Sequence, residues 1–264
     1  MELSLLKKAW HQFSYQCRQQ LTNCDLCGSA FNKEKQNVAL LCCDCVNTLP
    51  LFNLKKVQGD LLNWPAINRA LPHIYFDHLV CLAPYQYPFN QWITQFKYQG
   101  RFELAALFAD LLYQHLCTHF YNDAQSMDRL SYPLACSSSY SLAPDVILSV
   151  PLHCKKWQHR GYNQAHLLAK YFSQKINITY DKNGLLRQKH TSSQVGKTGA
   201  IRRKNLLNAF QVILNKTKIP AHVLLLDDVV TTGATASEIS RCLKLLGVKK
   251  VTVLAICLSL PASA

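Results

Sequence analysis

The sequence has no stretch of about 18 apolar residues free of charge, which is the minimum for a membrane-spanning helix. Its first residues, MELSLLKKAWHQ, lack the apolar run and the cleavage site of a signal peptide. We therefore expect a cytoplasmic protein without a transmembrane segment. In the reducing cytosol, cysteines that cluster in sequence indicate metal ligands rather than disulfides.

Acidic residues are scarce, because 15 Asp and Glu stand against 29 Lys and Arg, which gives a net charge of +14. The imbalance is concentrated between Ser149 and Lys216, where thirteen Lys or Arg accompany a single acid, Asp181. Such a local excess favours a polyanionic partner. A solvated basic surface would have the same composition, so composition alone leaves both interpretations open.

Four of the twelve cysteines have the spacing of a metal site, with Cys24 and Cys27 forming one CxxC pair and Cys42 and Cys45 another. Four thiolates form a closed tetrahedral zinc site without an open position, so we predict structural Zn²⁺ and no catalysis there. Cys43 is predicted not to be a ligand. A module this small needs such a metal to fold.

From residue 144 onwards, short apolar runs alternate with helical patterns. Strands are expected at 144–151, 210–214, 222–226 and 250–259, and helices at 163–174 and 234–246. This alternation predicts an α/β fold with a mostly parallel, doubly wound sheet.

The earlier part of the chain is less regular. Helical patterns are expected at 1–20, 89–98 and 102–116, and an insertion or mobile loop at 122–143. We divide the chain into a zinc-ribbon module with a short N-terminal helix (1–55), a connector (56–80) and an α/β domain (81–264).

The segment VLLLDDVVTTGAT (223–235) carries the clearest functional signal. Asp227 and Asp228 follow a buried strand, and ligands bind beyond the carboxyl ends of such strands. Small and hydroxylated residues then lead into a helix, where backbone N–H groups can bind a phosphate. We expect the acids to accept hydrogen bonds from ribose hydroxyls and the following residues to hold a 5′-phosphate; these residues are Thr231, Thr232, Gly233, Ala234 and Thr235.

Two basic segments are candidates for further phosphate contacts, or for DNA. The first, HCKKWQHRGYNQ, follows a predicted strand and suits a pyrophosphate loop, while the second, LLRQKHTSSQVGKTGAIRRKN, is typical of a mobile lid. An exposed helix start and a generic loop are the alternatives. The candidate residues are Lys155, Lys156, Arg160, Asn163, Gln164, Arg187, Thr191, Gln194, Arg202, Arg203 and Asn205.

The segment 223–235 closely resembles the PRPP-binding motif of type I phosphoribosyltransferases. Thr231 stands where purine salvage members carry an acid, which argues against purine salvage. The CxxC pairs, FKYQGRFELA, VPLH, RGYNQAHLLA, RQKHTSSQ, RRKNLLNAF and LLLDDVVTTGAT together resemble the ComF family of competence and GntX-like proteins. The resemblance implies a zinc ribbon followed by a type I phosphoribosyltransferase-like domain.

The resemblance also implies partners: PRPP with Mg²⁺, incoming single-stranded DNA, and a helicase-like competence protein. Trp157, Tyr162 and Tyr171 lie in the basic region and could stack on bases, although helical spacing favours a core position for Tyr171. Three functions remain open, namely a PRPP-binding and DNA-binding competence factor, a phosphoribosyltransferase with an unknown acceptor, and a PRPP sensor without turnover. No residue is assigned to catalysis.

Overall fold

The computed structural model describes residues 23–31, 38–120, 144–152, 157–158, 160–188, 206–214 and 219–259. The chain divides into two compact units, Met1–Pro50 and Leu51–Ala264, which we describe separately. The helix expected at 1–20 and the loop expected at 122–143 lie outside the described residues.

The first unit is built around a tight turn that carries the first cysteine pair. An antiparallel bridge joins Asn23 to Ala30, and the amide of Gly28 donates to the carbonyl of Cys24 over 2.8 Å. Gly28 has φ +74°, a conformation that glycine adopts most readily. The second pair lies at the start of the short helix α2 (Cys43–Asn47).

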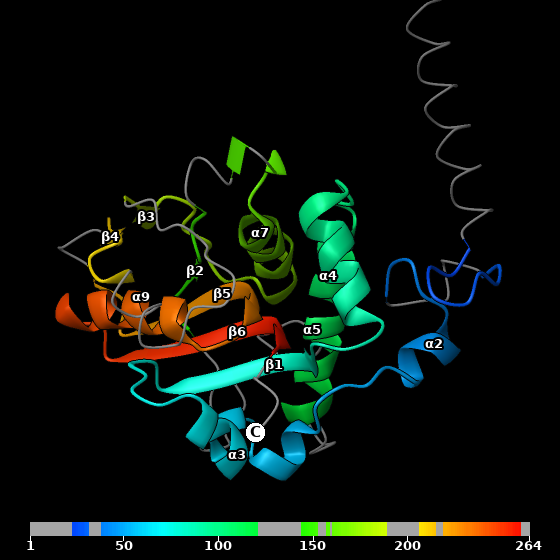
Figure 1. The fold of residues 1–264 in the computed structure, drawn as a ribbon, viewed down its shortest axis with the longest axis horizontal. Helices are drawn as coiled ribbons and strands as arrows, with labels where there is room; N and C mark the ends of the chain where they lie inside the picture. Colours follow the sequence, from blue (N-terminus) through cyan, green and yellow to red (C-terminus); the bar gives the residue numbers. More distant parts are fainter. Residues whose placement is uncertain are drawn as a thin grey trace, which may run out of the picture. The chain divides into compact units, whose positions relative to one another are not determined.

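The second unit contains a four-stranded parallel sheet in the order β1-β6-β5-β2 (Figure 1). The strands are β1 (His78–Pro84), β2 (Val146–Ser149), β5 (His222–Val230) and β6 (Lys250–Leu258). Nearly every residue of β5 and β6 is buried, as expected for parallel strands covered on both faces.

Helices cover the sheet on both faces, which confirms the doubly wound α/β class. Consecutive residues of β2 point to opposite faces. Ser149 bonds to Tyr180, which in turn contacts His166 of α7 (Gln164–Ile176). Leu148 instead lies against Gly184, just before the small antiparallel sheet of β3 (Leu185–Arg187) and β4 (Phe210–Val212).

The other helices also belong to this core. Helix α9 (Ala234–Leu245) packs on β4 and β6, while α5 (Leu104–Phe120) packs against α7. Helix α4 (Phe89–Tyr98) spans the predicted range and buries the rings of Phe89 and Phe96. Among the described helices, none combines the length and apolar character that crossing a bilayer requires.

Residues expected to form a connector are packed into the second unit instead. Together with Leu54 and Lys55 from the end of the predicted zinc-ribbon module, they form η2 (Leu54–Val57), η3 (Leu61–Asn63) and α3 (Pro65–Ala70), each with buried apolar side chains. The buried carboxylate of Asp60 accepts from the amides of Leu62 and Leu79 at 2.9 and 3.0 Å, and contacts His78 Nδ1 at 2.8 Å. These bonds fasten the segment to β1.

Candidate functional site

The acids Asp227 and Asp228 lie within β5 rather than after it. The strand extends to Val230 because β6 pairs with it throughout, with Asp227 opposite Ala255. On the other side β2 stops at Ser149, opposite Leu226, so the acids extend beyond the end of that neighbour. The pair therefore lies at the carboxyl edge of the sheet, where parallel α/β folds bind ligands.

Asp228 forms an ion pair with Lys97, which comes from the last turn of α4. Lys97 Nζ lies 2.8 Å from Asp228 Oδ1, and the two side chains are only 18% and 13% exposed. Burial alone would lower the pKa of Lys97, but the charge and hydrogen bond of Asp228 outweigh burial and raise that pKa. The lysine is therefore a fixed cation at the strand end. Lys97 is not among the residues predicted for the site, although FKYQG belongs to a stretch that supported the family resemblance.

Asp227 lies in a different environment from its neighbour, since consecutive strand residues point to opposite faces. Burial, together with the charge of Asp228, raises the pKa of Asp227 to about 7. Arg187 of β3 is a nearby cation, and its guanidinium stacks over the ring of Phe210 at 5.4 Å. Of the basic residues in the predicted lid, Arg187 is thus brought to the acid pair.

The turn after β5 has the backbone form that a phosphate-binding loop needs. Gly233 has φ +66° and is the N-cap residue of α9. A Cβ there would meet only ordinary contacts, 3.5 Å from Leu71 and Phe76, so backbone conformation rather than space requires the glycine. Within the described part of the chain, no protein acceptor is bonded to the amides of residues 231–235.

Of the first basic segment, Arg160 lies beside the site and two amide residues support the loop. Arg160 stacks over Tyr98 at 5.0 Å and donates to its hydroxyl at 3.1 Å. Asn163 caps α7 and donates to the carbonyl of Val150 at 3.0 Å. Gln164 is 1% exposed and donates to the carbonyl of Phe96. Both side-chain amides are bonded to protein groups. Asn163 and Gln164, which were predicted to contact the ligand, therefore support the loop instead.

Two aromatic side chains from the same region differ from expectation. Tyr171, expected in the core, is 39% exposed because it lies on the outer side of α7. Tyr162 donates its hydroxyl to the carbonyl of Phe96, which commits it to the protein rather than to a base. Trp157 is 55% exposed. The remaining predicted contacts lie outside the described residues: Lys155, Lys156, Thr191, Gln194, Arg202, Arg203 and Asn205.

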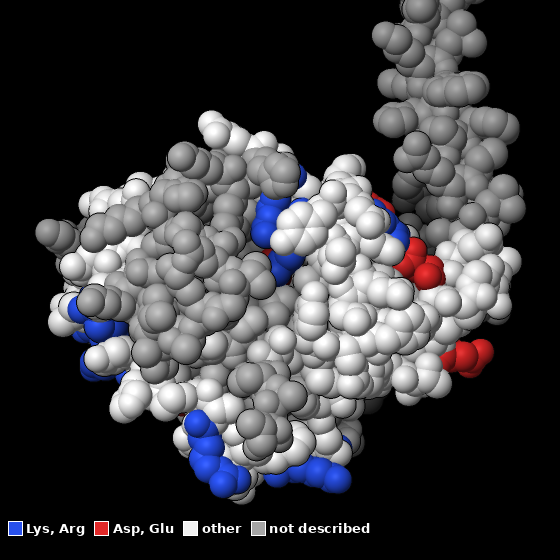
Figure 2. All heavy atoms as spheres, in the orientation of Figure 1, with Lys and Arg blue, Asp and Glu red and all other residues white. Residues whose placement is uncertain are grey.

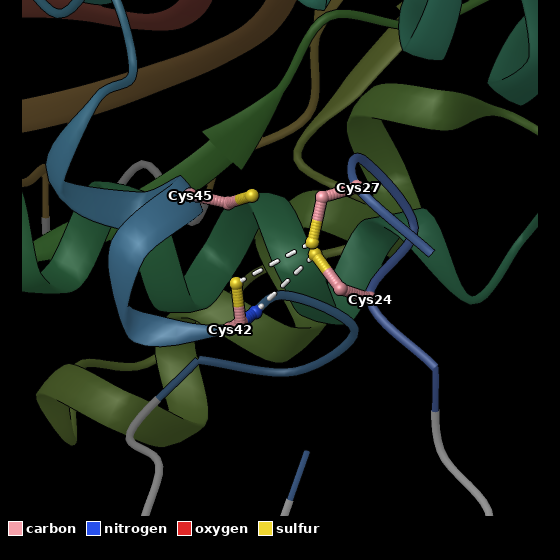
Figure 3. Close-up of side chains that lie close together, drawn as sticks. All are labelled: Cys24, Cys27, Cys42 and Cys45. Atoms are coloured by element: carbon pink, nitrogen blue, oxygen red, sulfur yellow. Dashed lines mark hydrogen bonds between the residues drawn. The ribbon is translucent and has the colours of Figure 1, made fainter. Parts of the chain in front are cut away.

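A separate site is formed by the four cysteines of the first unit. Figure 3 shows Cys24, Cys27, Cys42 and Cys45 with their sulfurs turned toward one another, and all four lie within 4.8 Å of each other. The sulfurs of Cys27 and Cys42 are 3.8 Å apart, and the amide of Cys42 points at Cys24 Sγ over 3.4 Å. Tetrahedral Zn²⁺ with bonds of about 2.3 Å requires sulfurs about 3.8 Å apart. The cluster therefore fits a tetrahedral metal ion such as zinc.

Cys43 lies outside this cluster. It is exposed, whereas Cys81 and Cys257 are fully buried. The metal-ligand prediction for the other four residues agrees with the geometry.

No family model matches the chain. The chain is 18% identical to a structure of glutamine phosphoribosylpyrophosphate (PRPP) amidotransferase from B. subtilis complexed with ADP and GMP. That match has a TM-score of 0.30 and covers 44% of this chain and 23% of the other.

Relatives in sequence show the family of the chain. Competence protein F of Haemophilus influenzae is 37% identical over 180 residues, covering 67% of this chain and 71% of that protein. DNA utilization protein YhgH of Salmonella typhimurium is 31% identical over 70% of this chain and 74% of its own length. YhgH of Escherichia coli K12 is 29% identical over 90% of each. The chain therefore belongs to the ComF family of competence protein F and its relatives.

Proposed function

We propose that this protein binds PRPP at the carboxyl edge of its sheet and takes part in the use of incoming DNA, in contact with single-stranded DNA. The DNA role is supported by relatives named for competence and for DNA utilization. The PRPP role is supported by the site itself.

The acid pair followed by the Gly233 turn carries the proposal. Asp227 and Asp228 supply carboxylate oxygens for the hydroxyls of a ribose. The turn supplies amides without a described protein acceptor at the start of a twelve-residue helix, where the helix dipole favours an anion. A sugar bearing hydroxyls and a 5-phosphate matches both ends of this segment.

Magnesium fits the same chemistry. Carboxylate and phosphate oxygens are the hard ligands that Mg²⁺ prefers, and the ion usually keeps several waters. Asp227 and Asp228 are the described residues that would approach it beside a diphosphate. When bound, Mg²⁺ would neutralise part of the phosphate charge.

The proposal for single-stranded DNA is supported by charge. Two of the thirteen basic residues between Ser149 and Lys216, Arg160 and Arg187, lie near the acid pair, and Lys175 pairs with Asp110. The other basic residues of this segment exceed what one PRPP molecule needs. A nucleic-acid backbone is the polyanion that would use them.

Calorimetry with Mg²⁺ and PRPP tests the sugar site. Wild type should bind, and Asp227→Asn with Asp228→Asn should weaken binding at least about thirtyfold, because each lost hydrogen-bonding group contributes about 1–3 kcal/mol. Asn keeps the side-chain shape, so the loss reports on charge and hydrogen bonding.

Asp77→Asn is the matched control. This acid precedes β1 at the opposite edge of the sheet, where it pairs with Lys244 at 2.6 Å and accepts from the Val251 amide. It should leave PRPP affinity unchanged. Equal affinity in wild type and the double variant would overturn the assignment of the acid pair.

A further inference from the structure

Lys97 is a buried cation whose presence the ribose and 5′-phosphate contacts do not explain. It is 18% exposed, it comes from a helix far from β5 in sequence, and its ammonium lies on a carboxylate of the site. A lysine buried at a ligand site needs an anion in every state of that site, because an unpaired buried charge is strongly unfavourable.

We infer that Lys97 contacts the diphosphate at C1 of PRPP and thereby makes the site select PRPP over ribose 5-phosphate. This inference rests on the proposed function and adds to it the residue that distinguishes the two ligands. In the free protein Asp228 takes the place of the diphosphate as counter-ion.

An exchange of partners follows from the geometry. When the hydroxyls of a ribose bind Asp228, they compete with the 2.8 Å contact between Asp228 Oδ1 and Lys97 Nζ. Ribose 5-phosphate carries its only anion at the other end, toward residues 231–235, and leaves the ammonium without compensation. PRPP brings a second anionic group at C1, so it can satisfy the released lysine. The cost of opening the ion pair is thus offset for one ligand and not for the other.

The loop beside Lys97 holds it in place from both sides. Tyr162 and Gln164 both donate to the carbonyl of Phe96, the residue before Lys97. Arg160 stacks on Tyr98, the residue after it. The end of α4 and the predicted pyrophosphate loop are therefore joined, which keeps Lys97 at the strand end when its partner changes.

The surrounding charges favour an anionic ligand beside the acid pair. The charge of Arg160 acts on Lys97, and that of Arg187 acts on Asp227. Figure 2 shows basic atoms gathered beside the α4 surface, which is itself mostly uncharged. Among the described residues, Lys97, Arg160 and Arg187 thus place positive charge beside the two acids.

Calorimetry on the full chain with Mg²⁺ and, separately, PRPP, ribose 5-phosphate or pyrophosphate tests the inference. Lys97→Met should weaken PRPP and pyrophosphate binding about tenfold to a hundredfold, as expected for a lost charged hydrogen bond. Ribose 5-phosphate affinity should stay within about threefold or rise, because Asp228 is no longer occupied. Lys97→Arg should restore most of the preference for PRPP, since it keeps the charge.

Lys175→Met is the matched control, because Lys175 forms a similar half-buried ion pair with Asp110 between α7 and α5. It should leave the PRPP to ribose 5-phosphate ratio unchanged. Lys97→Gln, whose amide can still donate to Asp228, covers the case in which the Met variant does not fold.

The possible outcomes test the role of Lys97 and the proposed function separately. If Lys97→Met or Lys97→Gln weakens both sugars equally, Lys97 acts only by holding Asp228, and the inference is overturned. An unchanged ratio overturns it as well. Failure of wild type to bind any of the three ligands would instead remove the proposed function on which the inference rests.

Discussion

Asp227 belongs to the site, but its carboxyl lowers the stability of the folded chain at neutral pH and above. Its carboxyl is buried beside a second acid, and its pKa is raised to about 7. An unfolded Asp has a pKa near 3.9. Between these values the folded chain therefore binds more protons than the unfolded chain.

This difference fixes the sign of a pH effect. Stability falls with rising pH wherever the folded state holds the extra proton, so the contribution of Asp227 declines from about pH 4 to 7. Asp227→Asn should raise the unfolding free energy at pH 8 by on the order of 1–3 kcal/mol, and by much less near pH 5. Urea denaturation at both pH values measures this. A variant that is less stable at pH 8 would contradict the argument.

Single residues show how far the sequence predicts the site. The acids and the Gly233 turn could be predicted, because they lie in one continuous segment whose chemistry is local. Lys97 could not, since only the packing of α4 brings it to Asp228. Gln164 looked like a ligand contact because its amide is polar, but burial against the carbonyl of Phe96 assigns it to support.

At the scale of elements, long periodic segments were predicted well, whereas the ends of elements and short strands were predicted less well. Helix α4 has the predicted bounds, and α9 ends one residue earlier than expected. Strand β5 is longer than predicted because pairing with β6 continues past the acids, where the apolar pattern stops. Strand β3 was missed, since three residues carry too little pattern to distinguish a strand from a loop.

The tight turn of the first cysteine pair and helix α2 lead to a prediction about metal. Purified protein should contain one zinc per chain, and Cys43→Ser should retain it, because Cys43 is exposed and outside the cluster. Cys45→Ser should lose the metal, since three thiolates leave the tetrahedral site incomplete. Metal analysis by mass spectrometry measures both. Zinc lost from the Cys43 variant, or absent from wild type, would count against this ligand set.

At the scale of the whole molecule, charge distinguishes a site for PRPP from a site for DNA. Single-stranded DNA should bind with an affinity whose logarithm falls linearly with log salt, by about 0.7 per phosphate contact. Replacing Arg202, Arg203 and Lys204 together by Ala should weaken binding and flatten that slope. Fluorescence anisotropy across a salt series measures both quantities.

The same triple variant also discriminates between the two ligands, because these residues belong to the predicted lid. A variant that loses PRPP affinity yet keeps the wild-type salt slope with DNA would show that the basic segment serves the sugar. The control is Lys249→Ala with Lys250→Ala, basic residues outside 149–216, which should leave the slope unchanged.

The strand order β1-β6-β5-β2 governs when the fold can form during synthesis. Strand β6 leaves the ribosome last of the described strands, yet it separates β1 from β5 and pairs with both. Until it emerges, β1 has no partner among the described strands and β5 has a free apolar edge, the kind of surface on which chains aggregate. The acid pair is translated before β6, the strand that flanks it. Assembly of the sheet, and of the site at its edge, therefore waits for β6.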